Sequence, residues 1–153
     1  MLDKRSSAAP DRRAALALLS RASAPELAAA LARHWPGLEA RDCKPAEAGL
    51  VMLRGRMGGD GRPFNLGEAT MARAVVELPD GRRGHGFGLG RDRERARLAA
   101  IADALFQGEE DRALLQEALL VPVAARLEAM RAREAAEAAA TKVDFFTLRR
   151  GED

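Results

Sequence analysis

Glycine occupies every second position from Gly84 to Gly90, in the segment Gly84-His-Gly-Phe-Gly-Leu-Gly90. Because alternate residues of a strand point to the same face, a strand here has one face without side chains. Another backbone or a helix can lie very close to such a face. The period of two differs from the spacing of a phosphate-binding loop or a dinucleotide-binding fingerprint. We therefore predict a strand packed tightly within the chain; the alternative is a close-approach site for a partner subunit or a ligand.

The hydrophobic pattern places this strand in a sheet that has helices before and after it in the sequence. Alanine and leucine dominate before residue 35, apolar residues alternate from Leu50 onward, and the helical period returns after Asp92. Ser23 and Glu26 have the spacing of a capping box. The predicted elements are helices near 11–22 and 25–34, strands over 50–57, 64–78 and 82–90, and helices over 92–107, 109–120 and 123–140.

The order of these elements predicts the α+β class and a single domain over 1–153. Its parts are N-terminal helices (1–34), a central antiparallel β-meander of at least three strands (49–91), C-terminal helices (92–141) and an extended tail (142–153). The proline- and charge-rich segment around Cys43 is predicted to be a loop. Pro122 is expected to interrupt or restart the helix that it follows.

Charge and composition argue against nucleic acids and membranes as partners. The 25 basic and 23 acidic residues are interspersed, and aromatic residues make up only 4% of the chain, without any tyrosine. Single-stranded nucleic acids bind to aromatic stacking platforms, so nucleic acid is an unlikely partner. A membrane span needs about 20 apolar residues, and we find no such run, so no membrane association is expected. One cysteine fits a reducing compartment, and we predict a cytoplasmic protein.

The sequence contains few signs of a catalytic nucleophile or of a metal site. No Gly-x-Ser-x-Gly motif is present, and no histidine lies near Cys43 in the sequence. The two histidines, His34 and His85, have no cysteine or histidine at ligand spacing, whereas a structural zinc site needs about four ligands. We predict no metal site made by this chain alone, and the catalytic residues stay unknown.

Glu68 interrupts an otherwise apolar strand face, where a carboxylate is costly unless it is paired. Arg54, Arg56 and Arg73 lie on neighbouring predicted strands and are its candidate partners. We expect a buried or interfacial ion pair. The same three arginines are candidate contacts for an anionic group, so an independent enzyme or binder for a phosphate-like ligand stays open as an alternative. A second alternative is an arginine-mediated nucleic-acid binder.

Three motifs together resemble one family. They are Phe64-x-Leu-Gly-Glu68-x-Thr70-x-x-Arg73, the segment Gly90-Arg91-Asp92 after the glycine strand, and Val143-Asp144-Phe145-Phe146 near the end. The chain resembles the PhnG family of phosphonate metabolism, whose members are subunits of the bacterial carbon–phosphorus lyase system, from about Arg33 to its end.

The resemblance implies an accessory subunit of a multisubunit enzyme. Members form a core complex with subunits H, I and J. With subunits H, I and L they support transfer of phosphonate to the ribose C1 of MgATP, which releases adenine. The resemblance carries over no catalytic residue and implies no cofactor bound by this chain alone, with MgATP a substrate of the complex. We expect the motif residues to hold the sheet or an interface, and Phe145 and Phe146 to dock on this subunit or on a partner.

Overall fold

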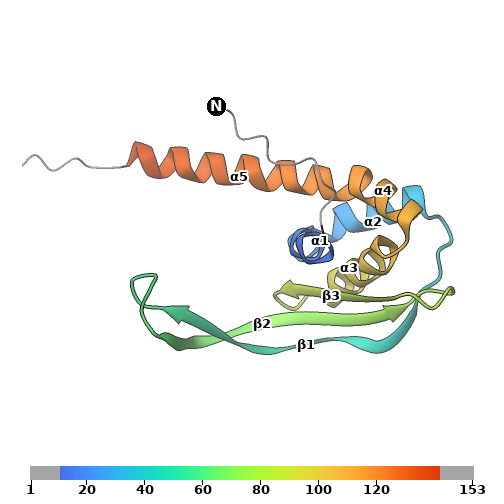
Figure 1. The fold of residues 1–153 in the computed structure, drawn as a ribbon, viewed down its shortest axis with the longest axis horizontal. Helices are drawn as coiled ribbons and strands as arrows, with labels where there is room; N and C mark the ends of the chain where they lie inside the picture. Colours follow the sequence, from blue (N-terminus) through green and yellow to red (C-terminus); the bar gives the residue numbers. More distant parts are fainter. Residues whose placement is uncertain (1–10, 142–153) are drawn as a thin grey trace, which may run out of the picture.

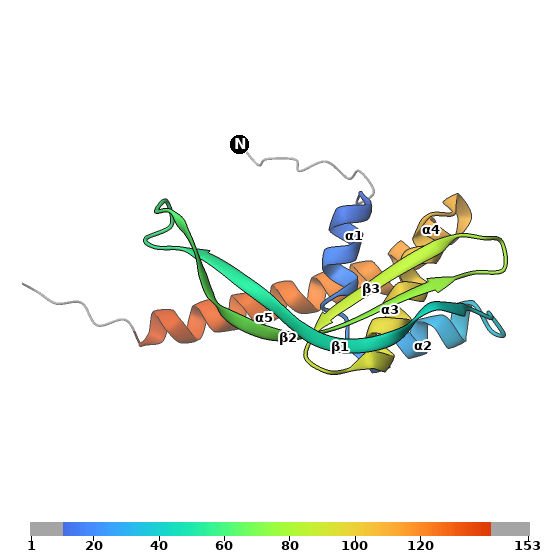
Figure 2. The same cartoon turned by 90° about the horizontal axis from the view of Figure 1, so that it is seen from below.

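Helices cover one face of a three-stranded antiparallel sheet, and the other face is open (Figures 1 and 2). The computed structural model describes residues 11–141. The elements are α1 (Arg12–Leu19), α2 (Ala24–His34), β1 (Arg41–Arg56), β2 (Pro63–Glu77), β3 (Arg83–Leu89), α3 (Arg93–Phe106), α4 (Glu109–Leu115), a π-helical turn (Gln116–Leu120) and α5 (Val121–Ala140). The strand order β1-β2-β3 confirms the predicted meander and the α+β class.

The glycine strand is β3, and its bare face lies against α3. Residues along β3 alternate between exposed and buried, with the glycines buried. A Cβ atom at Gly84 or Gly86 would collide with backbone atoms of α3 at Ala100 or Ala96. The helix meets the strand with a stripe of buried alanines, Ala96, Ala100 and Ala104. The predicted tight packing within the chain is therefore confirmed.

The core consists of two clusters on the two sides of α3. One cluster joins α1 and α2 to the C-terminal helices through residues such as Leu19, Leu27 and Leu120. The other lies between α3 and the sheet, where Val76 and Leu105 are fully buried. No single helix in the described part of the chain is long and apolar enough to cross a membrane; the bent pair α1–α2 passes such a test by length and composition only.

Glu26 holds the start of α2 and ties α5 to it. Its carboxylate accepts hydrogen bonds from the backbone N–H and hydroxyl of Ser23 (2.7 and 2.8 Å), which confirms the predicted capping box. It also pairs with Arg126 at 2.7 Å. Burial opposes ionisation of Glu26, but the hydrogen bonds from Arg126 and Ser23 outweigh it and lower the pKa.

In the Glu26→Gln variant, the free energy of unfolding is expected to fall less than in the wild type as the pH is lowered. A carboxylate with a pKa lower in the folded state stabilises the fold above its unfolded pKa of about 4.3, and this stabilisation is lost as the pH falls through the folded pKa. We expect the wild type to lose about 0.5 kcal/mol more than Glu26→Gln between pH 7 and acid pH. Urea unfolding across that range measures the difference. Glu134→Gln, at an exposed position of α5, is the control; equal acid limbs for wild type and Glu26→Gln would contradict the prediction.

The start of the sheet differs from the prediction. β1 begins at Arg41 and not near Leu50, so the segment around Cys43 is strand and not loop. Two register shifts, between Asp42 and Lys44 and between Lys44 and Glu47, absorb the irregular pairing around Pro45. Proline lacks an N–H donor, and an edge strand such as β1 tolerates this.

The first two strands extend beyond the third as a hairpin arm, residues 50–70. β3 pairs only with Met71–Glu77 of β2, whereas β1 continues to pair back to Pro63. No helix covers the arm (Figure 1). The apolar even positions predicted over 64–78 do not share one face, because the register shift between Leu53 and Arg54 turns Phe64 and Leu66 to the face away from the helices, where they are exposed.

Pro122 does not break the chain of helices. α4 passes through the π-helical turn directly into α5, with Pro122 in the first turn of α5. A proline ring clashes with the carbonyl four residues earlier in a regular helix, and the wider π turn at that point relieves the clash. The predicted restart at Pro122 thus takes the form of a π-helical turn.

Candidate functional site

The open face of the sheet, here the outer face, carries ion pairs near the base of the hairpin. Directly opposed residues of antiparallel strands share a face, and the outer face is the one that bears the exposed residues of β3. Glu77 pairs with Arg41 (2.7 Å) and Arg83 (2.6 Å), and Glu47 pairs with Arg73 (2.7 Å). The hydrogen bonds from Arg41 and Arg83 lower the pKa of Glu77, and the one from Arg73 lowers the pKa of Glu47.

Beyond these pairs the outer face is apolar. Phe87 and Leu89 lie on it opposite Arg73 and Met71, and it continues into the arm. Gly55 is directly opposite Phe64, and the Leu66 side chain fills the space that a Cβ atom of Gly55 would occupy. We call the resulting set the outer strip, and its members are Leu53, Phe64, Leu66, Phe87 and Leu89. They are exposed by 39% (Phe87) to 68% (Leu89).

The predicted cluster around Glu68 does not form. Glu68 lies opposite Met52 on the arm, is exposed, and has no ion pair among the described residues. Arg73 pairs with Glu47 instead. Arg54 and Arg56 lie farther along the arm, opposite Asn65 and Pro63. The buried form of the expected ion pair was wrong, because no helix covers this part of the strand and the carboxylate is exposed. The interfacial form stays a prediction.

The segment Gly90-Arg91-Asp92 connects β3 to α3. Gly90 has a φ of 98°, a conformation that favours glycine, and its N–H donates to the Thr70 carbonyl at 2.9 Å. The Asp92 side chain caps α3 by accepting from the Arg95 N–H at 2.9 Å. Arg91 is exposed. The motif residues thus set the angle at which α3 returns onto the glycine face.

Asp103 is a buried carboxylate that the sequence analysis did not single out. It is fully buried on α3 and accepts two hydrogen bonds from the Arg12 guanidinium (2.9 and 2.8 Å) and one from the His85 backbone N–H (2.8 Å). It thereby joins α1, α3 and β3. Its signal in the sequence is a single acidic residue inside the apolar stretch from Leu98 to Phe106.

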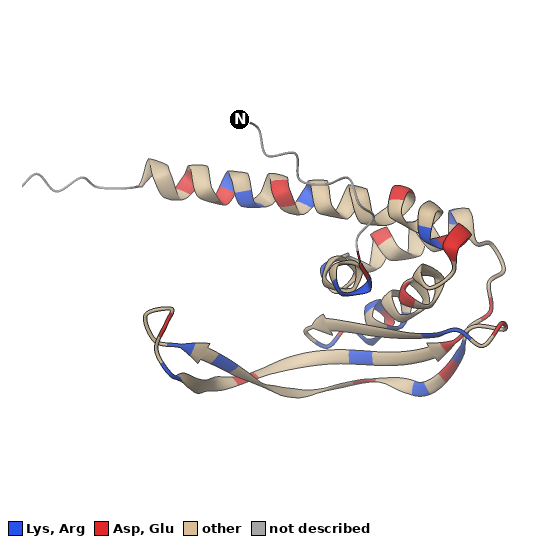
Figure 3. Ribbon diagram, in the orientation of Figure 1, with Lys and Arg blue, Asp and Glu red and all other residues tan. Residues whose placement is uncertain are grey.

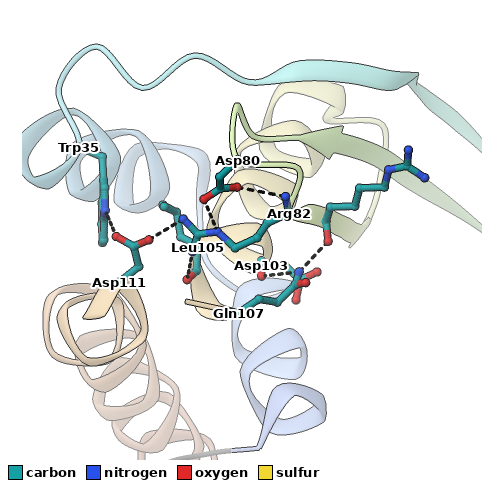
Figure 4. A network of polar contacts seen from close by, with 8 residues as sticks. Trp35, Asp80, Arg82, Asp103, Leu105, Gln107 and Asp111 are labelled. Carbon is teal, nitrogen blue, oxygen red and sulfur yellow. Dashed lines mark hydrogen bonds and ion pairs between the residues drawn. The ribbon is translucent and has the colours of Figure 1, made fainter. Parts of the chain in front are cut away.

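A second polar group connects the turn before β3 to α4 (Figure 4). Asp111 accepts from the Trp35 indole at 2.8 Å and pairs with Arg82 at 2.8 Å, and Arg82 also bonds Asp80 at 2.7 Å. Gln107 donates to the backbone carbonyl of Arg83 at 2.6 Å. Each of the three charged side chains is paired, and the Arg82–Asp111 pair joins the turn to α4, which is the pattern of a structural network.

The comparison with protein families shows the family of this chain. Residues 10–151 match the family model described as phosphonate metabolism protein PhnG. The chain belongs to the PhnG family. A curated relative from Rhizobium meliloti (strain 1021), named alpha-D-ribose 1-methylphosphonate 5-triphosphate synthase subunit PhnG, is 53% identical over 146 residues, which cover 93% of this chain and 90% of the relative. The resemblance inferred from the motifs is confirmed.

The PhnG motif residues lie on two parts of the molecule. Glu68 and Thr70 are on the arm, Arg73 follows it, and Gly90, Arg91 and Asp92 form the junction to α3. Asp144, Phe145 and Phe146 lie outside the described residues. The described motif residues therefore lie on the sheet and at its junction with α3.

The described part of this PhnG chain has shallow depressions on its surface. Over residues 11–141, no group of three or more His, Cys, Asp or Glu side chains could hold a metal ion. A shallow depression of about 670 Å³ lies beside Arg41, Arg97 and Ile101. Arg97 pairs with Asp42 (2.7 Å) and Arg41 with Glu77, so the positive charge in this depression is already balanced by carboxylates.

Proposed function

We propose that this chain is an accessory subunit of an alpha-D-ribose 1-methylphosphonate 5-triphosphate synthase. The observation that carries the proposal is the 53% identity to a named subunit of that synthase, over nearly the whole of both chains. The exposed apolar residues of the sheet also support it, since large exposed apolar patches mark sites of protein–protein contact.

The proposed reaction is the transfer of a phosphonate to the ribose C1 of MgATP, with release of adenine. In this proposal MgATP and the phosphonate bind to the assembly, and this chain itself holds no cofactor. The proposed partners are subunits H, I and J of the carbon–phosphorus lyase system, and subunits H, I and L in the ribosyl-transfer step. We place the assembly in the cytoplasm.

Omission of this chain is expected to abolish adenine release by the assembly. Subunits H, I and L are mixed with MgATP and methylphosphonate, with and without this chain, and adenine is measured by chromatography. The Rhizobium meliloti relative, added in place of this chain, is the positive control because it is 53% identical. Full turnover without either chain would contradict the proposal. Turnover by this chain alone would instead support an independent enzyme for an anionic substrate.

A further inference from the structure

We infer that the end of the hairpin arm is a binding site for a phosphate or phosphonate group, whose oxygen atoms accept hydrogen bonds from Arg54 and Arg56. The inference rests on the proposed function for the identity of the ligand. Both substrates of the proposed reaction carry such a group, MgATP in its triphosphate and methylphosphonate in its phosphonate. This chain would then help to hold a substrate of the assembly.

Arg54 and Arg56 lie on the same face of the arm, opposite to the outer strip. They are two positions apart on β1, so their side chains leave the strand on the same side. They lie opposite Asn65 and Pro63 of β2. Gly55, which lies between them, belongs to the outer face with its partner on β2. Two guanidinium groups therefore start from neighbouring places on one surface.

Both arginines line one shallow depression of about 530 Å³ at the end of the arm. Gly55, Gly59 and Pro63 complete its lining. The two glycines have no side chain, and the proline ring is uncharged, so the lining carries positive charge and no carboxylate. An anion in this depression would meet two guanidinium groups without a competing acid in the wall.

The charge of these two arginines is not balanced within the described chain. Arg41, Arg73 and Arg83, nearer the base of the hairpin, pair with carboxylates at 2.7, 2.7 and 2.6 Å. Basic positions lie near the far end of the arm (Figure 3). Over residues 11–141, neither Arg54 nor Arg56 forms an ion pair. This distinguishes their depression from the one beside Arg41, where carboxylates already balance the charge.

The arm has too few acidic residues to neutralise its arginines. Residues 50–70 contain three arginines and two acids, Asp60 and Glu68, which gives a formal charge of +1. Glu68 lies opposite Met52, and Asp60 is in the turn that joins β1 to β2. Neither acid forms an ion pair within the described part of the chain. The end of the arm is therefore able to accept an anion from outside.

The position of Arg56 is partly fixed before any ligand binds. Its Nη1 atom donates to the Gly61 carbonyl at 3.0 Å, which ties the guanidinium group to the turn. An arginine has five N–H donors, so most of them are still available to a ligand. Less side-chain freedom then has to be lost when the ligand binds.

The chemistry of the two side chains selects the class of ligand. A guanidinium group presents its donors as a fork that matches two oxygen atoms of a phosphate or a carboxylate. A terminal phosphate or a phosphonate has three oxygen atoms and up to two negative charges, so it can accept from both forks at once. A single carboxylate has only two oxygen atoms and one charge. Two unpaired arginines on one face therefore favour the phosphate or phosphonate group.

Titration of the full-length chain tests the site directly. Methylphosphonate and MgATP are each added to the ¹⁵N-labelled wild type and to Arg54→Gln with Arg56→Gln, and NMR shifts give the dissociation constants. Arg13→Gln with Arg62→Gln is the matched control, because it removes the same charge from two exposed arginines outside the depression. The melting temperature of each variant checks its fold.

We expect Arg54→Gln with Arg56→Gln to weaken binding roughly tenfold or more, since each lost hydrogen bond between charged groups is worth about that factor. The control should keep the affinity of the wild type. A loss confined to methylphosphonate would assign the site to the phosphonate, and a loss confined to MgATP would assign it to the triphosphate. A wild type that binds neither ligand, or an equal loss in the control, would overturn the inference.

Kinetics of the assembly connect the site to the proposed reaction. With subunits H, I and L present, the Gln variant should release adenine with a KM raised about tenfold for the substrate whose binding it weakens, and with nearly unchanged kcat. An unchanged KM would show that the site does not serve the reaction. Poor assembly of the variant in native mass spectrometry, without ligand binding by the wild type, would instead assign the arginines to an acidic surface of a partner. If the wild-type assembly releases no adenine, the proposed function fails, while the titration still decides the anion site.

Discussion

Gly86→Ala is expected to lower the free energy of unfolding by about 3 kcal/mol, the upper part of the range for overpacking a core. The added methyl group would meet the Ala96 carbonyl oxygen and the Ala100 nitrogen, which belong to the backbone of α3. A flexible side chain can move away from such a clash, but a helix backbone can do so only by shifting the whole helix. We therefore expect α3 to move off the sheet and to lose contacts along its buried alanine stripe.

Thermal unfolding followed by circular dichroism measures this effect, with an expected drop in the melting temperature of roughly 6–12 °C. Gly49→Ala is the matched control, because Gly49 is also a strand glycine and nothing lies within 4 Å of an added Cβ there. Gly88→Ala tests whether the clash must be with backbone atoms, since the atoms nearest to its Cβ belong to the guanidinium group of the Arg95 side chain. Equal stabilities of Gly86→Ala and Gly49→Ala would show that the strand and helix are not packed as described.

Local chemistry explains why much of this fold was predictable. The glycine period required a close neighbour for β3, and the small residues of α3 are that neighbour. Ser23 and Glu26 marked the start of α2 because both partners of a capping box lie within four residues. Signals of this kind need only adjacent positions, so one sequence suffices to find them.

Which strand face is covered could not be predicted in the same way. Alternation in 64–78 showed that the strand has an apolar side, but the register shift between Leu53 and Arg54 places Phe64 and Leu66 on the open face of the sheet, whereas Ala72 and Val76 face the helices. Glu68, predicted to form a buried or interfacial ion pair, is exposed. β1 also begins earlier than expected, because the register shifts around Pro45 depend on pairing with β2 and have no local signature.

The Asp103 group was missed because its partners are remote. Arg12 is 91 positions away in the sequence, and His85 contributes a backbone N–H, which any residue at that position could supply. An acidic residue in an apolar helix stripe signals that some partner exists. It does not reveal which of the arginines supplies it.

Arg12→Ala is expected to be more damaging than removal of the carboxylate that it pairs with. It leaves Asp103 fully buried with only the His85 N–H as a donor, and breaking a buried pair in this way typically costs about 3–5 kcal/mol. Because the Arg12 side chain is 45% exposed, water already screens part of the pair, and we expect about 3 kcal/mol. Asp103→Ala removes the buried charge and leaves the His85 N–H unsatisfied, for which about 1–3 kcal/mol is expected.

The decisive measurement is a double-mutant cycle by urea unfolding. The double variant Arg12→Ala with Asp103→Ala should be more stable than Arg12→Ala alone, because the second substitution removes the carboxylate that the first leaves buried without its cation. Arg13→Ala, at the exposed neighbouring position of α1, is the control and should change the stability by less than about 0.5 kcal/mol. If Arg12→Ala is no worse than Arg13→Ala, the Arg12 guanidinium does not hold the Asp103 carboxylate, and α1 must be fixed to α3 by its apolar contacts alone.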